Sequence, residues 1–164
     1  MARESDSDTL GILQDAFPPE PLVPNEILGP SRAATYFAGN EHAQLFENEL
    51  SGKTWLSVNV ESLDRDHDIL FFLPPVGFAD LLPALMLAAT TRFEQFSRLA
   101  ELLSTLLTRD PSKWEEFEQR ISAMNPKQRD AVTKSLERLE KLFGASWHSN
   151  PAQVALDSFW RAPK

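Results

Sequence analysis

Ser51-Gly52-Lys53-Thr54 is the part of this chain that comes nearest to a nucleotide-binding motif. A phosphate-binding loop also needs a second glycine five residues before Gly52, a buried strand before the loop and a helix after it. Here that earlier position is a glutamate, the preceding segment is acidic with helical spacing, and Trp55 follows. A helix that ends at Gly52, followed by an exposed lysine, explains the same residues without nucleotide binding.

Asp64-Arg65-Asp66-His67-Asp68 has the alternating carboxylates with which a calcium-binding loop begins. Such a loop also requires a glycine at its sixth position and a glutamate at its twelfth. In this chain those positions are Ile69 and Pro75. We therefore interpret the segment as an acidic, solvated loop at which a basic partner could dock.

The other side-chain types that commonly catalyse reactions do not form recognisable catalytic or metal-binding groups in this sequence. None of His42, His67 and His148 has a second histidine or a carboxylate at the i,i+4 spacing of a helical zinc site. The chain has no cysteine, which excludes disulfides, thiolate catalysis and cysteine-based zinc sites. Asp80 lies in an apolar stretch and could be a buried acid with a raised pKa, although a single acid there more commonly caps a turn or pairs with arginine. We expect no enzyme activity, no cofactor and no metal.

The aromatic pairs Trp147-His148 and Phe159-Trp160 are candidates for partner binding, because aromatic residues are enriched at interface hot spots. The alternative is that these rings fasten the last helix to the core. We retain both tryptophans as candidate binding residues, together with carboxylates of the acidic segments. The full set of candidates is Glu47, Glu49, Asp64, Asp66, Asp68, Trp147 and Trp160.

The elements that must position these residues are predicted to be helices. Three Asx-Pro pairs each place a capping side chain before a proline at the first helical position: Asp110-Pro111, Asn125-Pro126 and Asn150-Pro151. Apolar residues recur at helical spacing after each pair, and Gly144 ends the second of these helices. Because no strand pattern of comparable strength competes, we predict an all-α, or nearly all-α, bundle of about six or seven helices.

Proline-rich sequence near the N-terminus predicts an extended strap. Five of the twelve prolines lie between Pro18 and Pro30, and each disfavours helix at the residue before it. Two overlapping P-x-x-P patterns there lack a close basic residue, which favours a strap lying over the domain rather than an SH3 ligand. We predict a single domain over residues 1–164, with a short helix in 1–16, the strap in 17–31 and a helical core in 32–164.

Residues 31–60 have sequence patterns that predict secondary structure less clearly than those after residue 110. A helical pattern covers residues 31–50 and is best between Glu41 and Leu50. The alternation of Leu56, Val58 and Val60 allows a short strand.

Residues 69–89 are the most apolar run of the chain, and they are long enough to cross a bilayer. Three prolines, Gly77 and Asp80 interrupt the run, and acidic residues flank it, which argues against a membrane span. We predict a short extended piece over 69–73 and then a buried helix over 75–90, in which Pro83 makes a kink or marks the first turn.

Acidic residues are concentrated in the first half of the chain. Residues 1–82 contain fourteen Asp/Glu and four Lys/Arg, a net charge of −10, whereas residues 83–164 contain ten and twelve, a net charge of +2. The electrostatic field of this acidic half repels nucleic acid and attracts basic proteins. The alternative is that the acidic surface only keeps the protein soluble. Residues 1–8 lack the basic and apolar segments of a signal peptide, so we expect a cytoplasmic protein.

Several short motifs stand out together. They are Phe17-Pro18 in the strap, Ser51-Gly52-Lys53-x-Trp55, Leu70 to Leu73 with Pro75, Phe78 followed by Leu82-Pro83-Ala84, and Asn125-Pro126-x-Gln128-Arg129-x-Ala131-Val132. Over most of residues 10–143 this set resembles an uncharacterised family of small bacterial helical proteins. The resemblance implies a bacterial origin and a single domain, and it implies no activity, because none is established for that family.

These observations favour a non-enzymatic bacterial interaction protein. The most concrete hypothesis is a cytosolic immunity protein whose acidic surface binds and neutralises a cognate, basic toxin. The alternative is an adaptor or regulatory domain that binds a peptide or a partner helix in an apolar groove. An enzyme of unfamiliar type, with Asp80 and a histidine in a pocket, is a third hypothesis. Neither nucleic acid nor a membrane is expected as a partner.

Overall fold

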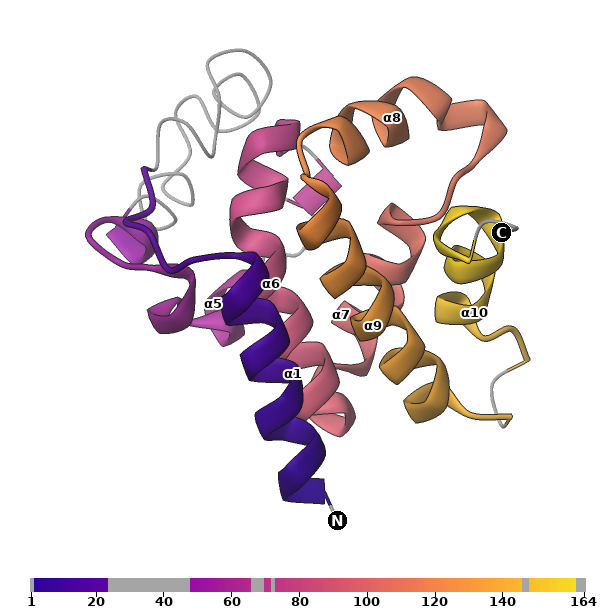
Figure 1. Cartoon of the computed structure of the whole chain (residues 1–164), viewed down its shortest axis with the longest axis horizontal. Coiled ribbons are helices and arrows are strands. Elements are labelled where there is room, and N and C mark those ends of the chain that lie inside the picture. Colours follow the sequence, from indigo (N-terminus) through magenta and orange to yellow (C-terminus); the bar gives the residue numbers. More distant parts are fainter. Residues whose placement is uncertain (1, 24–47, 66–69, 72, 146–147, 162–164) are drawn as a thin grey trace.

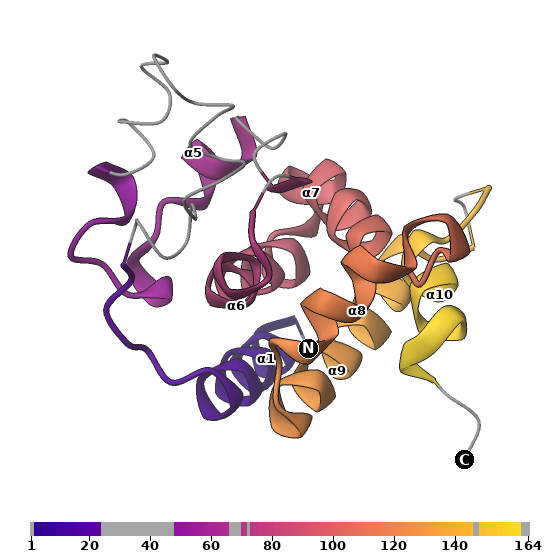
Figure 2. The same ribbon diagram turned by 90° about the horizontal axis from the view of Figure 1, so that it is seen from above.

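The computed structural model describes residues 2–23, 48–65, 70–71, 73–145 and 148–161, and 77 % of the structure is helical. No strand occurs in these ranges, so the all-α prediction is confirmed for them. Helix α6 (Pro75–Thr91) lies at the centre, and the other helices surround it (Figures 1 and 2). Its neighbours are α1 (Ala2–Ala16), α5 (Val60–Arg65), α7 (Phe93–Leu106), α8 (Trp114–Ser122) and α9 (Pro126–Phe143).

The composition of α6 explains its central place. Twelve of its seventeen residues are buried, so it is apolar on nearly every side and can be covered only by other helices. It begins with Pro75 at its first position, where the missing N–H costs nothing, so Pro83 lies inside the helix and does not mark its first turn. Thr90 and Thr91 donate hydroxyl hydrogen bonds to carbonyls one turn earlier. The predicted buried helix over 75–90 is confirmed.

No helix in the described part of the chain combines the length and the apolar character that crossing a membrane requires.

Each of the three Asx-Pro pairs starts a helical segment as predicted. The side-chain oxygens of Asp110, Asn125 and Asn150 accept hydrogen bonds from backbone N–H groups two or three residues later, at 2.8, 2.9 and 3.1 Å. After Asp110 the first turn is a 3₁₀ turn, Pro111–Lys113, which leads directly into α8. The caps satisfy amides that the first helical turn would otherwise leave unpaired.

The two last helices close one side of the bundle. The predicted apolar stripe of α9 is buried, and Gly144 ends the helix with a φ of +63° that favours glycine. Helix α10 (Pro151–Ala155) contacts α7 and α9, and continues into a π-helical turn, Leu156–Trp160. The buried stripe of α9 consists of Val132, Leu136, Leu139 and Phe143.

At the N-terminus, α1 packs on α6 and α9 through an apolar side that includes Leu13 and Ala16. The helix spans Ala2–Ala16, within the predicted range of 1–16, and ends just before the prolines begin. Residues 18–23 of the predicted strap then form neither a helix nor a strand, and the Glu20 N–H donates to the Pro18 carbonyl at 2.9 Å in a tight turn. Two hydrogen bonds hold this segment. The Leu22 N–H donates to the Lys53 carbonyl at 2.8 Å, and the Trp55 indole N–H donates to the Phe17 carbonyl at 2.7 Å.

The short strand considered for residues 56–60 is wrong. Trp55–Ser57 is a 3₁₀ turn, begun by reciprocal hydrogen bonds between Thr54 and Ser57, and Val60 is already the first residue of α5. Val60 and Leu63 are both buried at a spacing of three, which is a helical and not a strand period.

Two neighbouring predictions are tested only in part. Leu70 and Phe71 lie in a 3₁₀ turn rather than in an extended piece. Of the helix predicted over residues 31–50, residues 48–50 are described and are helical. The predicted end at Ser51-Gly52 is confirmed, because Gly52 has a φ of +71°.

Candidate functional site

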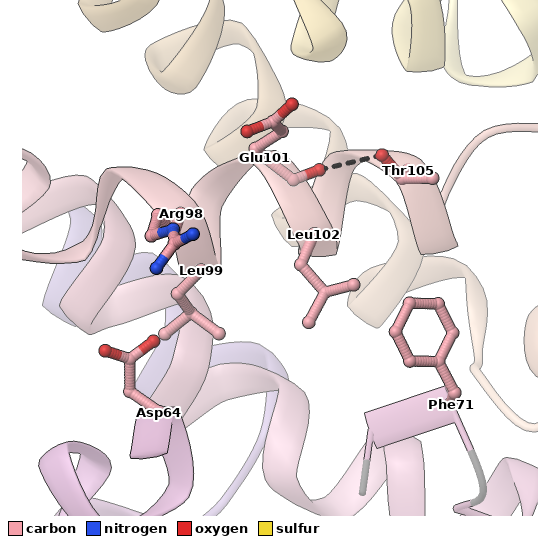
Figure 3. Close-up of a pocket in the computed structure, with 7 residues that line it drawn as sticks. All are labelled: Asp64, Phe71, Arg98, Leu99, Glu101, Leu102 and Thr105. Atoms are coloured by element: carbon pink, nitrogen blue, oxygen red, sulfur yellow. Dashed lines mark hydrogen bonds between the residues drawn. The ribbon is translucent and has the colours of Figure 1, made fainter. Parts of the chain in front are cut away.

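A hollow of about 320 Å³ lies between α5, α7 and the turn at Leu70–Phe71, and we name it the α5–α7 pocket (Figure 3). Its volume is at the lower end of the range for ligand pockets, roughly 300–1,000 Å³, so it is large enough for one or two side chains. Its lining residues are Asp64, Phe71, Arg98, Leu99, Glu101, Leu102 and Thr105.

Helix α7 supplies most of this pocket because it is amphipathic. Leu99 belongs to the core, and half-buried Leu102 packs against that core. Arg98, Glu101 and Thr105 are exposed on the same side of the helix, at steps of three and four. The Thr105 hydroxyl donates to the Glu101 carbonyl at 2.9 Å, so its proton is already used within the helix (Figure 3). The pocket therefore has an apolar floor and a charged rim.

Phe71 forms the other wall of the α5–α7 pocket. Leu70 and Leu73, on either side of it in the sequence, are buried in the core and hold the turn in place. Phe71 itself remains 44 % exposed. Figure 3 shows its ring at one end of the hollow, with Leu99 and Leu102 between it and the charged end. A large apolar side chain is thus left in contact with water inside a concave surface.

Charge of both signs surrounds the pocket. Asp64, from the last turn of α5, and Arg98 lie at the end opposite Phe71, and Glu101 stands on the rim (Figure 3). The three groups sum to a charge of −1. Among the described residues of the lining there is neither a serine nor a histidine. Its residues can bind an apolar side chain and orient a basic group next to it.

The sequence-predicted binding residues do not all gather at this pocket. Asp64 lines it, whereas half-buried Glu49 pairs with Lys53 across 3.2 Å. Trp160 is only 9 % exposed, and its indole N–H donates to the Leu107 carbonyl at 2.8 Å. Its ring fastens the last helical segment to the core, which was the alternative considered for it. The remaining candidates lie outside the described residues: Glu47, Asp66, Asp68 and Trp147.

Part of the N-terminal acidity pairs with basic residues of the second half of the chain. Asp6 forms an ion pair with Arg138, and Asp15 forms one with Lys127 at 2.9 Å, so both pairs join α1 to α9. Glu61 of α5 pairs at 2.5 Å with Arg92, the residue between α6 and α7. Some acids of the N-terminal half therefore join helices of the fold through ion pairs, in addition to any role in binding a partner.

A second hollow, of about 330 Å³, lies along the proline-rich strap, and we name it the strap pocket. Asp80, the acid of the enzyme hypothesis, is half-buried and lines it, and the described residues of this lining include no histidine. Within the described ranges no three His, Cys, Asp or Glu side chains are grouped so as to hold a metal ion. The strap pocket is lined by Phe17, Pro18, Glu20, Pro21, Leu22, Val23, Trp55, Val76, Asp80, Pro83 and Gln128.

Trp114 is an exposed aromatic residue at the start of an apolar stripe with helical spacing in the sequence. Phe117, Ile121 and Met124 of that stripe are buried, but Trp114 is 44 % exposed at the start of α8. The Arg109 guanidinium lies 3.6 Å from the centre of its ring, a cation–π contact.

Comparisons with protein-family models, with curated proteins and with solved structures found no match to this chain. The resemblance to a family of small bacterial helical proteins therefore depends on its quoted motifs alone.

Proposed function

We propose that this chain is a non-enzymatic interaction protein that binds a protein partner at the α5–α7 pocket. The observation that carries the proposal is Phe71, which lies 44 % exposed beside Leu102 in a hollow with a charged rim. Burying apolar surface gains roughly 25 cal/mol per Å², and an aromatic ring at the centre of a contact is a common binding hot spot.

The lining suggests the chemistry of the partner. An apolar side chain fits the hollow between Phe71 and Leu102, and a basic group next to it would face Asp64. Arg98 is exposed at the same rim and could donate hydrogen bonds to a carboxylate of the partner, which would fix the orientation of that partner. The formal net charge of −8 attracts a basic partner over longer distances and raises the rate of association.

The most concrete form of the proposal is a cytosolic immunity protein that neutralises a cognate toxin by covering its active surface. The acidic net charge and the apolar, charge-rimmed pocket support this form. An adaptor or regulatory domain would use the same pocket for a peptide or a partner helix. The two forms differ in their consequence, because only an immunity protein abolishes the activity of its partner.

Co-expression with the product of the neighbouring gene tests the proposal. We expect a complex that survives purification, and we expect the chain to restore growth of cells that the product would otherwise kill. Phe71→Asp should weaken binding at least tenfold, which corresponds to about 1.4 kcal/mol. Leu142→Asp is the matched control, because Leu142 is 39 % exposed on α9 and lies outside the pocket lining.

The outcomes separate the two forms and can overturn both. A Phe71-dependent complex in which the partner stays active would support the adaptor form. A Phe71-dependent complex with restored growth would support the immunity form. No complex and no rescue, or equal effects of the Phe71 and Leu142 substitutions, would overturn the binding site proposed here.

A further inference from the structure

We infer that the strap pocket binds an organic cation, namely an alkylammonium or guanidinium group carried on an apolar stem. This site is separate from the α5–α7 pocket, and the inference does not rest on the function proposed for that pocket. Three features of its lining support it: the apolar walls, the fixed strap and the sign of the charges.

The walls of the strap pocket are largely apolar. Phe17, Leu22 and Trp55 are buried and form its inner side. Val23 and Val76 stand at the same hollow and are 45 % and 55 % exposed, although both are large apolar residues. Two exposed valines at one concavity leave an apolar surface that the stem of a ligand can cover.

The strap forms a fixed wall of this pocket. Leu22 is held by its hydrogen bond to the Lys53 carbonyl, and the Phe17 carbonyl accepts the indole N–H of Trp55. Pro18 and Pro21 restrict the backbone between these two points. A ligand would therefore not have to order the strap on binding, which lowers the entropic cost of association.

The charged side chains among the described residues of the lining are both acidic. Asp80 is half-buried on α6, one turn after Val76, and Glu20 is exposed on the strap. No Lys or Arg is among the described residues of the lining. A carboxylate has two oxygens with about four acceptor sites, so Asp80 can receive a cation in addition to its other interactions.

These features select a cation over other ligands. An anion would meet two like charges, and a neutral alkyl chain would remove water from the carboxylates without replacing it. Phe17 and Trp55 of the lining are aromatic, and a cation that reaches the face of either ring would be attracted to it. The Gln128 side-chain oxygen accepts the Asn125 N–H at 3.0 Å in the cap of α9, so this part of the lining is also fixed.

The cationic group that this pocket binds can belong to a free amine, or to a lysine or arginine side chain of a partner. The test is a titration of the full ¹⁵N-labelled chain with n-hexylammonium, followed by NMR. We expect saturable shifts of the Trp55 indole N–H and of amides in residues 17–23 and 76–83. n-Hexanol, the neutral counterpart, should bind about tenfold more weakly, and hexanoate should not saturate.

Three variants complete the test. Asp80→Asn should lower the affinity for n-hexylammonium to that for n-hexanol, and Glu20→Gln should lower it about twofold to fivefold. Glu20 is exposed on the strap, so its variant keeps the test decisive if Asp80→Asn does not fold. Glu115→Gln is the matched control, because Glu115 is an exposed acid of α8 outside the pocket, and this variant should bind like the unchanged chain.

A blocked peptide, acetyl-Gly-Lys-Gly-amide, distinguishes the two sources of the cation. Binding at least as tight as that of n-hexylammonium assigns the pocket to a lysine side chain, and binding of the free amine alone assigns it to a small amine. Equal affinities for n-hexylammonium and n-hexanol would overturn the inference. So would the absence of shifts at Trp55, or unchanged amine affinity in both the Asp80 and the Glu20 variants.

Discussion

The indole N–H of Trp160 donates a 2.8 Å hydrogen bond to the backbone carbonyl of Leu107, and this bond ties the last helical turn to the end of α7. Both residues are buried, so no water replaces the bond when it is lost. We expect Trp160→Phe to lower the free energy of unfolding by about 1–3 kcal/mol, the cost of a buried polar group without a partner. Urea-induced unfolding measures this loss.

Trp114→Phe is the matched control for that experiment. Trp114 is exposed at the start of α8, so removing its indole N–H should change the free energy of unfolding by less than about 0.5 kcal/mol. Equal losses in the two variants would show that the buried bond of Trp160 contributes nothing particular.

Asn150 makes two hydrogen bonds at the start of α10. Its side-chain oxygen accepts the Gln153 N–H at 3.1 Å, and its amide group donates to the Glu140 carbonyl of α9 at 2.8 Å. Asn150→Ala should therefore destabilise the chain by about 1–2 kcal/mol, near the upper end for the loss of a cap. Thermal unfolding of Ser149→Ala, which changes the exposed residue next to it, should show no shift. A shift of the same size in both variants would contradict the role of the cap.

The caps also explain why the helices after residue 110 could be predicted from the sequence. An Asx-Pro pair depends only on its own neighbours, because the side chain caps the very helix that the proline begins. The buried stripe of α9 is similarly local, since one face of one helix determines it. The strand considered over residues 56–60 failed because Leu56 and Val58 alternate by chance, while Thr54 and Asn59 supply turn and helix starts.

The binding surfaces could be predicted only in part. The α5–α7 pocket brings Asp64 and Phe71 together with α7, and no local pattern indicates which helices become neighbours. Trp160 and Trp114 show the same difficulty, because either could have been the exposed ring on sequence grounds. Their exposure follows from the position of α8 at the edge of the bundle and from the contact of the last turn with Leu107.

Glu61 should make stability depend on pH. A hydrogen bond to its own backbone, followed by the hydrogen bond from Arg92, lowers the pKa of Glu61 below its ordinary value. A carboxyl whose pKa is lower in the folded chain adds stability above its unfolded pKa, about 4.3. That stability is lost as the pH falls through the folded value. We expect Glu61→Gln to lower the unfolding midpoint at pH 7 and to leave it unchanged near pH 2.

The Arg92→Gln background provides the control for this pH dependence. Without the guanidinium, the difference between Glu61 and glutamine should become smaller at pH 7, because only the hydrogen bonds from the backbone and from Gln95 still lower the pKa of Glu61. A difference that stays constant from pH 7 to about pH 2 would contradict the assignment to the Glu61 carboxylate.

Two ion pairs join α1 to α9 and differ in their exposure, which allows a direct test of how much the N-terminal acids stabilise the fold. The Asp6 and Arg138 side chains are 38 % and 20 % exposed, and Arg138 also donates to the Thr9 hydroxyl at 2.9 Å. The Asp15 and Lys127 side chains are 71 % and 59 % exposed. Water and salt screen the second pair more strongly.

We expect a double-mutant cycle of Asp6→Asn and Arg138→Gln to give a coupling energy of about 0.5–1 kcal/mol, towards the upper end for partly exposed pairs. The matched cycle of Asp15→Asn and Lys127→Gln should give less than about 0.3 kcal/mol. Arg138→Gln alone should cost more than Asp6→Asn, because it also loses the bond to Thr9. Urea-induced unfolding at low and at high salt measures all four states of each cycle. Equal coupling in the two cycles would mean that burial of the Asp6–Arg138 pair does not strengthen it, and negligible coupling in both would mean that the acids of α1 contribute to the surface charge rather than to the fold.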